Sequence, residues 1–370
     1  MTAVGLPQLV HRHAPKIPNP GCSEKMPPRA LCPRSDQATA GRPGDPSPLA
    51  GRGRWALLAA LGVLALGCGD EGGRPPIIDM HLHPMPWGPD EVRETSDFTA
   101  GWRVTMAAMD RLGIVRAVAS GTTDAIEHWR RLSPDRIIAG ILFPCDRGIA
   151  ANGGRQCFAD GDSLPDLDWL RAEIVAGRIG VLGEITTQYL GLEPDHPMML
   201  PYYALAEELD VPIAIHLGDG PPGAAYPNGP CGAEPCSARY RAGAGDPLGL
   251  ESLLLRFPRL RVFVMHAGWP MLDRMLAILF QHPQVYVDVA ILGHAAIMPR
   301  ASFHHHLCRL VESGFGDRIM YGTDAGAAGF EESIEAIETA PCLSAEQRRD
   351  IFHDNAARFL RLADAPESDQ

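Results

Sequence analysis

Short runs of apolar and β-branched residues alternate with longer stretches of helical periodicity along most of this chain. The strand-like runs cover residues 76–80, 115–119, 137–143, 181–185, 211–215, 261–265, 285–289 and 319–321, and a helical stretch follows each of them. Strands that alternate with helices form parallel sheets, and eight such units are typical of a closed barrel. The sequence therefore predicts an α/β fold, a single-domain (β/α)8 TIM barrel over residues 69–370.

The helical stretches of this barrel are clearest at residues 202–209, 303–313 and 350–362, where apolar residues recur at helical spacing. Two long loops, 146–163 and 218–246, follow the third and the fifth predicted strands. Loops that follow strands form the catalytic face of a barrel, and long loops without structure of their own are usually functional. We expect these two loops to shape a substrate pocket.

The first 68 residues have the composition of a leader. An apolar run begins at Trp55, behind Arg52 and Arg54, and ends in Leu66-Gly67-Cys68, which resembles a bacterial lipobox. The run is too short to cross a bilayer comfortably but suits a signal-peptide core; a buried helix is the alternative. Residues 55–68 therefore predict an exported lipoprotein of the bacterial cell envelope, anchored through acyl chains on Cys68. Residues 1–54 predict a disordered leader or a mis-called start of translation.

Charge and cysteines narrow the class of protein further. Residues 1–54 hold eight Lys/Arg and three Asp/Glu, so the remainder carries 25 of the 33 basic and 42 of the 45 acidic residues. An acidic body without a basic stripe gives no support to nucleic-acid binding.

The even number of cysteines after Cys68 favours disulfides in an exported protein over a metal-binding cysteine cluster. Local pairing would join Cys145 with Cys157 and Cys231 with Cys236, and would leave Cys308 and Cys342.

Metal-ligand residues stand at the carboxyl ends of four predicted strands. His81 and His83 lie at the end of the first, and period-two geometry points both rings to the same side. His216 ends the fifth strand, His266 the sixth, and Asp324 follows the eighth. Because these strand ends converge on one face of a barrel, we expect the five side chains to share a divalent cation.

This ordered set resembles the amidohydrolase superfamily, in particular its amidohydrolase-2-like branch of metal-dependent barrel hydrolases. The resemblance covers residues 76–362 and rests on five stretches: Ile-Ile-Asp-Met-His-Leu-His-Pro in the first strand, Val-Pro-Ile-Ala-Ile-His in the fifth, His266, residues 317–324 and residues 355–360. It implies a metal-dependent enzyme that acts on a small molecule. It does not specify the substrate.

The fourth strand departs from the pattern of many relatives, in which a carboxylated lysine bridges two metals. Both lysines of the chain, Lys16 and Lys25, lie in the leader, so that bridge is impossible here. Glu184 stands at the end of the fourth predicted strand, where some branches of the family use a glutamate as the bridging ligand. The alternative is an ordinary acid paired with an arginine. A site that includes Glu184 has room for two ions, and without Glu184 we expect one.

Imidazole and carboxylate ligands suit Zn²⁺, although other first-row divalent ions bind the same donors. The resemblance implies that the ion activates a water molecule for attack on an ester, lactone, amide or related bond. Asp324 would orient this water and take its proton. His266 would be a ligand, or would polarise the substrate carbonyl.

Several other polar residues lie on the expected catalytic face. His294 and Arg241 are candidates for substrate contact, and Arg241 suits an anionic group. Trp87, Trp269, Tyr240 and Asp288 are weaker candidates for lining the pocket, and residues 304–306, three consecutive histidines, are expected at the surface near the start of a helix.

Two other functions remain open. Similar barrels decarboxylate aromatic or unsaturated acids with the same metal, and a non-catalytic lipoprotein could bind metal or a partner without turnover.

Overall fold

The computed structural model describes residues 74–84, 98–145, 158, 163–218, 220–228, 235, 237–324 and 326–363. The chain divides into two units, Met1–Cys68 and Gly69–Gln370. The first unit, with the predicted leader, signal core and Cys68, lies outside the described residues. The described helices include none that combines the length and the apolar character needed to cross a membrane.

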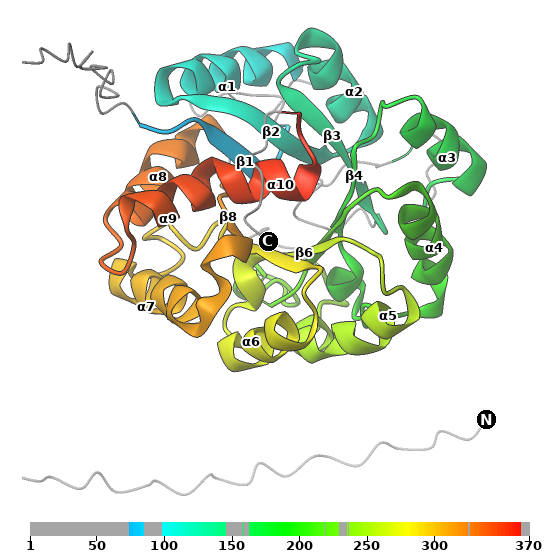
Figure 1. The fold of residues 1–370 in the computed structure, drawn as a ribbon. Coiled ribbons are helices and arrows are strands. Elements are labelled where there is room, and N and C mark those ends of the chain that lie inside the picture. The colour runs from blue at the N-terminus through cyan, green and yellow to red at the C-terminus, as the bar shows by residue number, and fades with distance from the viewer. Residues whose placement is uncertain are drawn as a thin grey trace, which may run out of the picture. The chain divides into compact units, whose positions relative to one another are not determined.

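Eight parallel strands form the sheet, in the order in which they follow one another along the chain (Figure 1). They are β1 (Ile77–Leu82), β2 (Ile114–Gly121), β3 (Ile137–Phe143), β4 (Val181–Ile185), β5 (Ile213–His216), β6 (Val262–Met265), β7 (Val285–Asp288) and β8 (Ile319–Met320). Backbone hydrogen bonds from Met80 to Tyr321 (2.9 Å) and from Asp324 to His81 (2.7 Å) join β1 to the segment after β8. The predicted (β/α)8 barrel is confirmed.

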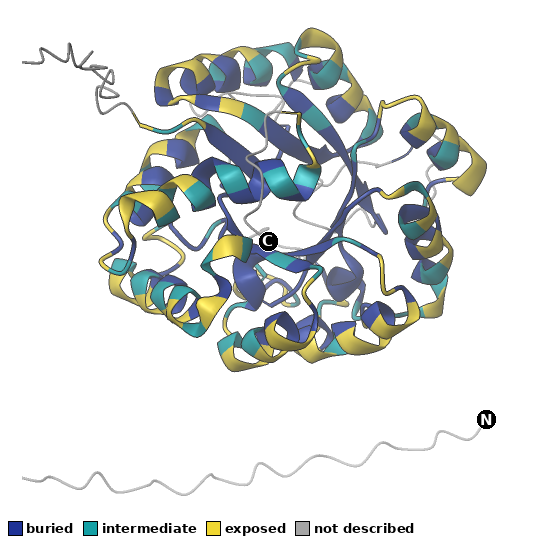
Figure 2. Ribbon diagram, viewed as in Figure 1, coloured by how far each residue is buried: buried dark blue, intermediate teal, exposed yellow. Residues whose placement is uncertain are grey.

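Helices surround the strands and turn their buried sides inward (Figure 2). They are α1 (Phe98–Leu112), α2 (Thr123–Leu132), α3 (Leu167–Val175), α4 (Leu200–Leu209), α5 (Leu250–Arg256), α6 (Leu272–Gln281), α7 (Arg300–Leu310), α8 (Phe330–Glu338), α9 (Ala345–Arg349) and α10 (Asn355–Leu360). The helix predicted over 202–209 is α4. The one predicted over 303–313 begins three residues earlier, as α7, and ends in a π-helical segment, Val311–Phe315.

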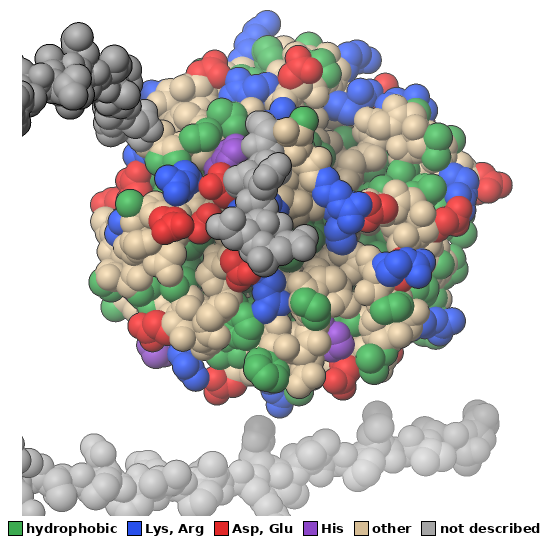
Figure 3. All heavy atoms as spheres, in the orientation of Figure 1, with side chains coloured by type: hydrophobic (Ala, Val, Ile, Leu, Met, Phe, Trp, Pro, Cys, Tyr) green, Lys and Arg blue, Asp and Glu red, His purple; other side chains and the backbone are tan. Residues whose placement is uncertain are grey.

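Apolar side chains fill the inside of the barrel, and α10 closes its amino-terminal end. The predicted closing helix over 350–362 is a π-helical turn, Asp350–Asp354, followed by α10. The ring of Phe359 packs on Phe263 of β6 and on Tyr286 of β7, with ring centroids 5.6 and 4.8 Å apart. Because α10 closes this end, substrate access is left to the opposite end, where the strands terminate. On the closed face, acidic and basic side chains are interspersed (Figure 3).

Disulfide bonds are present, as the even cysteine count predicts. Cys308 of α7 is bonded to Cys342, which follows α8, with an S–S distance of 2.08 Å. Cys145 is disulfide-bonded as well. Cys157, Cys231 and Cys236 lie outside the described residues, so their predicted local pairings stay predictions.

Candidate metal centre

The carboxyl ends of the strands bring together the six residues that the sequence predicts as metal ligands. His81 is in β1, Glu184 in β4 and His216 at the end of β5, while His83, His266 and Asp324 lie just after β1, β6 and β8. The three strand residues and His266 are at most 2% exposed, and His83 is 8% exposed. The side chain of Asp324 is 23% exposed, so Asp324 is the ligand-type residue that a molecule entering from the loops would meet.

One half of the centre is formed by His81, His83 and the carboxylate of Asp324. The Nε2 atoms of His81 and His83 are 3.2 Å apart. Oδ1 of Asp324 lies 3.2 Å from Nε2 of His81 and 3.0 Å from Nε2 of His83. Asp324 has φ 53°, in the left-handed region, and its N–H donates to the carbonyl of His81. The backbone therefore holds the carboxylate against both rings.

Glu184 lies between this half and the pair formed by His216 and His266. Its Oε2 is 3.4 Å from Nε2 of His83 and 3.9 Å from Nε2 of His81. The ligand atoms of Glu184, His216 and His266 also lie within 4.8 Å of one another. Oε2 of Glu184 is buried and has no hydrogen-bond partner, which is costly for a carboxylate unless a cation is near. Glu184 is thus common to two groups that could each hold an ion.

An oxygen atom faces Nδ1 of each of the four histidines. These oxygens are Oδ2 of Asp288 for His81 (3.3 Å), the carbonyl of Ser120 for His83 (2.8 Å), Oε1 of Gln188 for His216 (3.0 Å) and the carbonyl of Ala290 for His266 (3.1 Å). A carbonyl can only accept, so the facing Nδ1 carries the proton and Nε2 keeps its lone pair. This is the arrangement of metal-binding histidines whose outer nitrogen is held by a partner, and the residues present fit a divalent cation.

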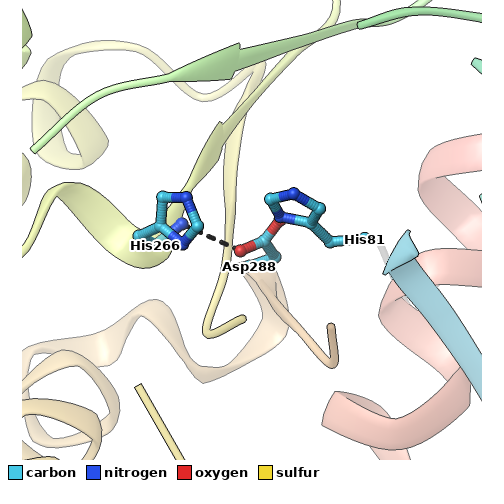
Figure 4. Close-up of side chains that lie close together, drawn as sticks. All are labelled: His81, His266 and Asp288. Carbon is cyan, nitrogen blue, oxygen red and sulfur yellow. Dashed lines mark hydrogen bonds and ion pairs between the residues drawn. The ribbon is translucent and has the colours of Figure 1, made fainter. Parts of the chain in front are cut away.

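Asp288 and Asp79 have larger roles than the sequence interpretation gave them. Asp288 faces His81 through Oδ2, and its Oδ1 accepts the backbone N–H of His266 at 2.9 Å (Figure 4). Asp79 accepts from the backbone of His81 and from both N–H and Oγ1 of Thr323, and burial raises its pKa to about 7. The period-two pattern contained a signal for Asp79, because it shares a strand face with His81 and His83.

The charges of the centre depend on one another. Burial alone would raise the pKa of Asp324, but the nearby rings of His81 and His83 bring it well below its usual value. Burial would lower the pKa of His81, and the carboxylates of Asp324 and Asp288 raise it well above the usual value. Burial, together with nearby His266, lowers the pKa of His216. Asp324 is therefore ionised and His216 neutral at pH 7.

The segment that presents His266 has an unusual backbone. His266, Ala267 and Gly268 have φ values of 60°, 47° and 63°, three left-handed residues in succession. His306 of α7 is 3% exposed and hydrogen-bonds the backbone of Ala267. The expected surface position of residues 304–306 therefore holds for His305, which is exposed, and is wrong for His306. His306 shares the buried face of α7 with Phe303, Leu307 and Leu310.

His306 should make stability depend on pH. Burial lowers its pKa from 6.5 to about 4, so between these values the unfolded chain binds a proton that the folded chain does not, and stability falls as pH falls. At 1.36 kcal/mol per pKa unit the full effect is about 3 kcal/mol. Urea unfolding of His306→Leu from pH 7 to pH 4 should show an acid loss smaller by about this amount, whereas His305→Leu should keep the wild-type slope. Equal slopes in all three proteins would contradict the assignment.

The two predicted substrate-contact residues have other partners. His294 lies 3.2 Å from Oε2 of Glu332 at the start of α8. Arg241 is exposed and donates to the carbonyls of Ala238 and Tyr240. Among the described residues, these partners lie outside the histidine and carboxylate group, so substrate contact by either residue stays a prediction. Trp87 lies outside the described residues.

Comparisons with known proteins agree with this geometry. The family model described as amidohydrolase matches residues 78–362. No curated protein matches the chain. An uncharacterised TIM-barrel protein from Bordetella bronchiseptica is 18% identical, with 77% of this chain and 98% of that chain covered and a TM-score of 0.54.

Two further solved structures have the same fold. A probable 2-pyrone-4,6-dicarboxylic acid hydrolase from Acinetobacter baumannii is 14% identical, with 77% and 99% of the two chains covered and a TM-score of 0.50. A dihydroxybenzoic acid decarboxylase from Polaromonas, solved with manganese and an inhibitor, is 14% identical, with 78% and 98% covered and a TM-score of 0.50. At these identities the likeness shows the fold alone. Since the matched family range runs from β1 through α10, the chain belongs to the amidohydrolase family.

Proposed function

We propose that this enzyme is a metal-dependent hydrolase that cleaves an ester, lactone, amide or related bond of a small molecule. The observation that carries the proposal is the set of four imidazoles with Nδ1 facing an oxygen, gathered with Glu184 and Asp324 at the open end of the barrel. Histidine nitrogen and carboxylate oxygen are the donors typical of catalytic zinc and related centres.

Zn²⁺ or another first-row divalent ion is the proposed cofactor, and Glu184 would contribute to both of the groups that could each hold an ion. His81, His83 and Asp324 would hold one ion, and His216 and His266 the other. When bound, such an ion polarises a substrate oxygen and lowers the pKa of a water molecule towards about 7. Manganese is a competing identity, since a barrel of the same fold was solved with it.

The chain's own residues would handle the proton. Asp324 is ionised at neutral pH and is the ligand-type residue most open to the loops, so its carboxylate can accept a proton from the attacking water. It would then return this proton to the leaving group. His266, if it is not a ligand, would donate a hydrogen bond to the carbonyl that is attacked.

Glu184→Gln should reduce the number of ions bound per chain from two to one. An amide keeps the shape of the side chain but lacks the charge that lets a carboxylate bridge two cations. Metal analysis of the purified, dialysed proteins measures this count. Glu332→Gln on α8, which also loses a carboxylate, should bind as many ions as the wild type, and an unchanged count in Glu184→Gln would remove Glu184 from the ligand set.

The decarboxylase reading is the second candidate, because one barrel of the same fold is named as a decarboxylase. Product analysis separates the two reactions. The metal-loaded protein would be incubated with panels of lactones, esters, amides and phosphoesters, and with aromatic and unsaturated acids. Water incorporation into the product supports hydrolysis, whereas carbon dioxide release from the acids would overturn it. Absence of turnover on both panels would favour the non-catalytic lipoprotein.

The proposed location is the bacterial cell envelope, with a lipid anchor on Cys68. The apolar run that ends at Cys68 supports export, and the Cys308–Cys342 disulfide suits an oxidising compartment. Mass spectrometry of the mature protein should find an acylated amino-terminal cysteine, and an unmodified Cys68 inside a longer chain would contradict this location.

A further inference from the structure

Gln188 connects the proposed metal centre to the loop that follows β5. It lies in a short 3-10 helix, Thr187–Leu190, directly after β4, and its side chain is fully buried. Its Oε1 lies 3.0 Å from Nδ1 of His216. Its Nε2 donates to the carbonyl of Gly218 at 2.8 Å and to the hydroxyl of Tyr240 at 2.9 Å. The amide therefore contacts the ring of His216 on one side and loop atoms on the other.

Hydrogen-bond chemistry fixes the direction of this amide. The carbonyl of Gly218 can only accept, so the amide nitrogen of Gln188 must face it. The amide oxygen must then face His216, and because an amide oxygen can only accept, Nδ1 of His216 carries the hydrogen. Nε2 of His216 keeps its lone pair, and this is the nitrogen that an ion would bind.

The backbone of Gly245 lies close against the side-chain amide of Gln188. A Cβ atom at Gly245 would lie 2.2 Å from the amide nitrogen of Gln188, so the glycine is what lets the chain pass this close. The backbone N–H of Arg241 also donates to the carbonyl of Gln188, at 3.4 Å. The side-chain amide is thus packed closely against the backbone of Gly245, and the backbone of Gln188 is tied to the loop.

We propose that Gln188 is a positioning residue that holds the imidazole of His216 as the Nδ1–H tautomer and so prepares its Nε2 for the divalent ion. This inference rests on the proposed metal-dependent function. Among the four imidazoles, His83 and His266 are held by backbone carbonyls and His81 faces a carboxylate. His216 alone among the four relies on a neutral side chain, so its partner can be replaced without changing the backbone.

Three variants of the full-length chain separate this role from loop anchoring. Gln188→Met keeps the approximate volume and removes the acceptor, Gln188→Glu keeps an acceptor for Nδ1, and Tyr240→Phe removes the loop contact alone. Zn²⁺ affinity is measured by competition with a chromophoric chelator. Loss of an outer partner of a metal-binding histidine typically costs about 10–100-fold in affinity, which is the loss expected for Gln188→Met. Gln188→Glu should recover most of it, and Tyr240→Phe should bind like the wild type.

The tautomer of His216 can be measured directly, and it would not change if Gln188 only stabilised the fold. Nitrogen-15 NMR of histidine-labelled, metal-free protein should place the proton of His216 on Nδ1 in the wild type and on a mixture of both nitrogens in Gln188→Met. A wild-type proton on Nε2, or unchanged Zn²⁺ affinity in Gln188→Met, would overturn the inference. So would an equal loss in Tyr240→Phe. If the wild type bound no ion, the proposed function would fail, and the tautomer measurement would still decide the role of Gln188.

Discussion

Asp324→Asn should lower kcat by about 10²–10⁴-fold, the contribution typical of a positioned general base. The amide has almost the shape of the carboxylate but cannot take a proton. The expected loss does not depend on unfolding, since the backbone N–H of residue 324 would still donate to the carbonyl of His81. Much of the bound metal should remain, because the four histidines and Glu184 are unchanged.

Kinetics and metal analysis on the same preparations test this expectation. Asp317→Asn is the matched control, because Asp317 is exposed just before β8, at the opposite end of the barrel, and it should keep wild-type kcat. Undiminished turnover in Asp324→Asn would reject Asp324 as the base. If turnover and the ion were lost together, the loss of activity would be explained by the missing metal ligand. It would then give no support to Asp324 as the base.

Replacing both His81 and His83 with alanine should have the largest effect on metal content. The change removes two buried donors whose Nε2 atoms lie 3.2 Å apart and leaves Asp324 without its two nearest rings. The ion that they are proposed to hold should be lost from the purified protein. Turnover should fall below detection, because the remaining residues cannot activate water alone.

Thermal unfolding gives a second readout for the double variant. A ligand at 100 times its Kd stabilises the folded state by about 2.7 kcal/mol, so added Zn²⁺ should raise the Tm of the wild type more than that of the variant. His305→Ala serves as the control, because this exposed histidine lies on α7, away from the centre, and should keep wild-type stoichiometry. Unchanged stoichiometry in the double variant would exclude His81 and His83 as ligands.

The strands were predictable because their apolar runs are short and sharply bounded. The predicted ranges for β3 and β4 agree with the structure at both ends, and β1 extends two residues further than predicted, through Leu82. The convergence of the six ligand-type residues was also predictable, since it follows from strand ends in a closed barrel. To predict this convergence, only the order of the strands and the residues at their carboxyl ends had to be known.

The partners that hold these residues could not be read from the sequence in the same way. Gln188 reaches His216 because of the path that the chain takes after β4, and that path depends on turns with no period. Asp288, the last residue of β7, was expected near the pocket, but its contact with His81 was not. His306 was misplaced because three consecutive histidines suggest a polar surface run, although His306 lies at helical spacing from Phe303 and Leu310 on the buried face of α7. His294 has an acidic partner, Glu332, that is 38 residues away in sequence.

The closure of the amino-terminal end of the barrel by α10 has a consequence for substrate entry and product release. Because the rings of Phe359, Phe263 and Tyr286 obstruct passage along the barrel axis, reactant and product must use the same doorway within the described part of the chain. A product that is released slowly would compete directly with the next substrate molecule. The same loops would therefore govern both the rate of product release and the substrate specificity.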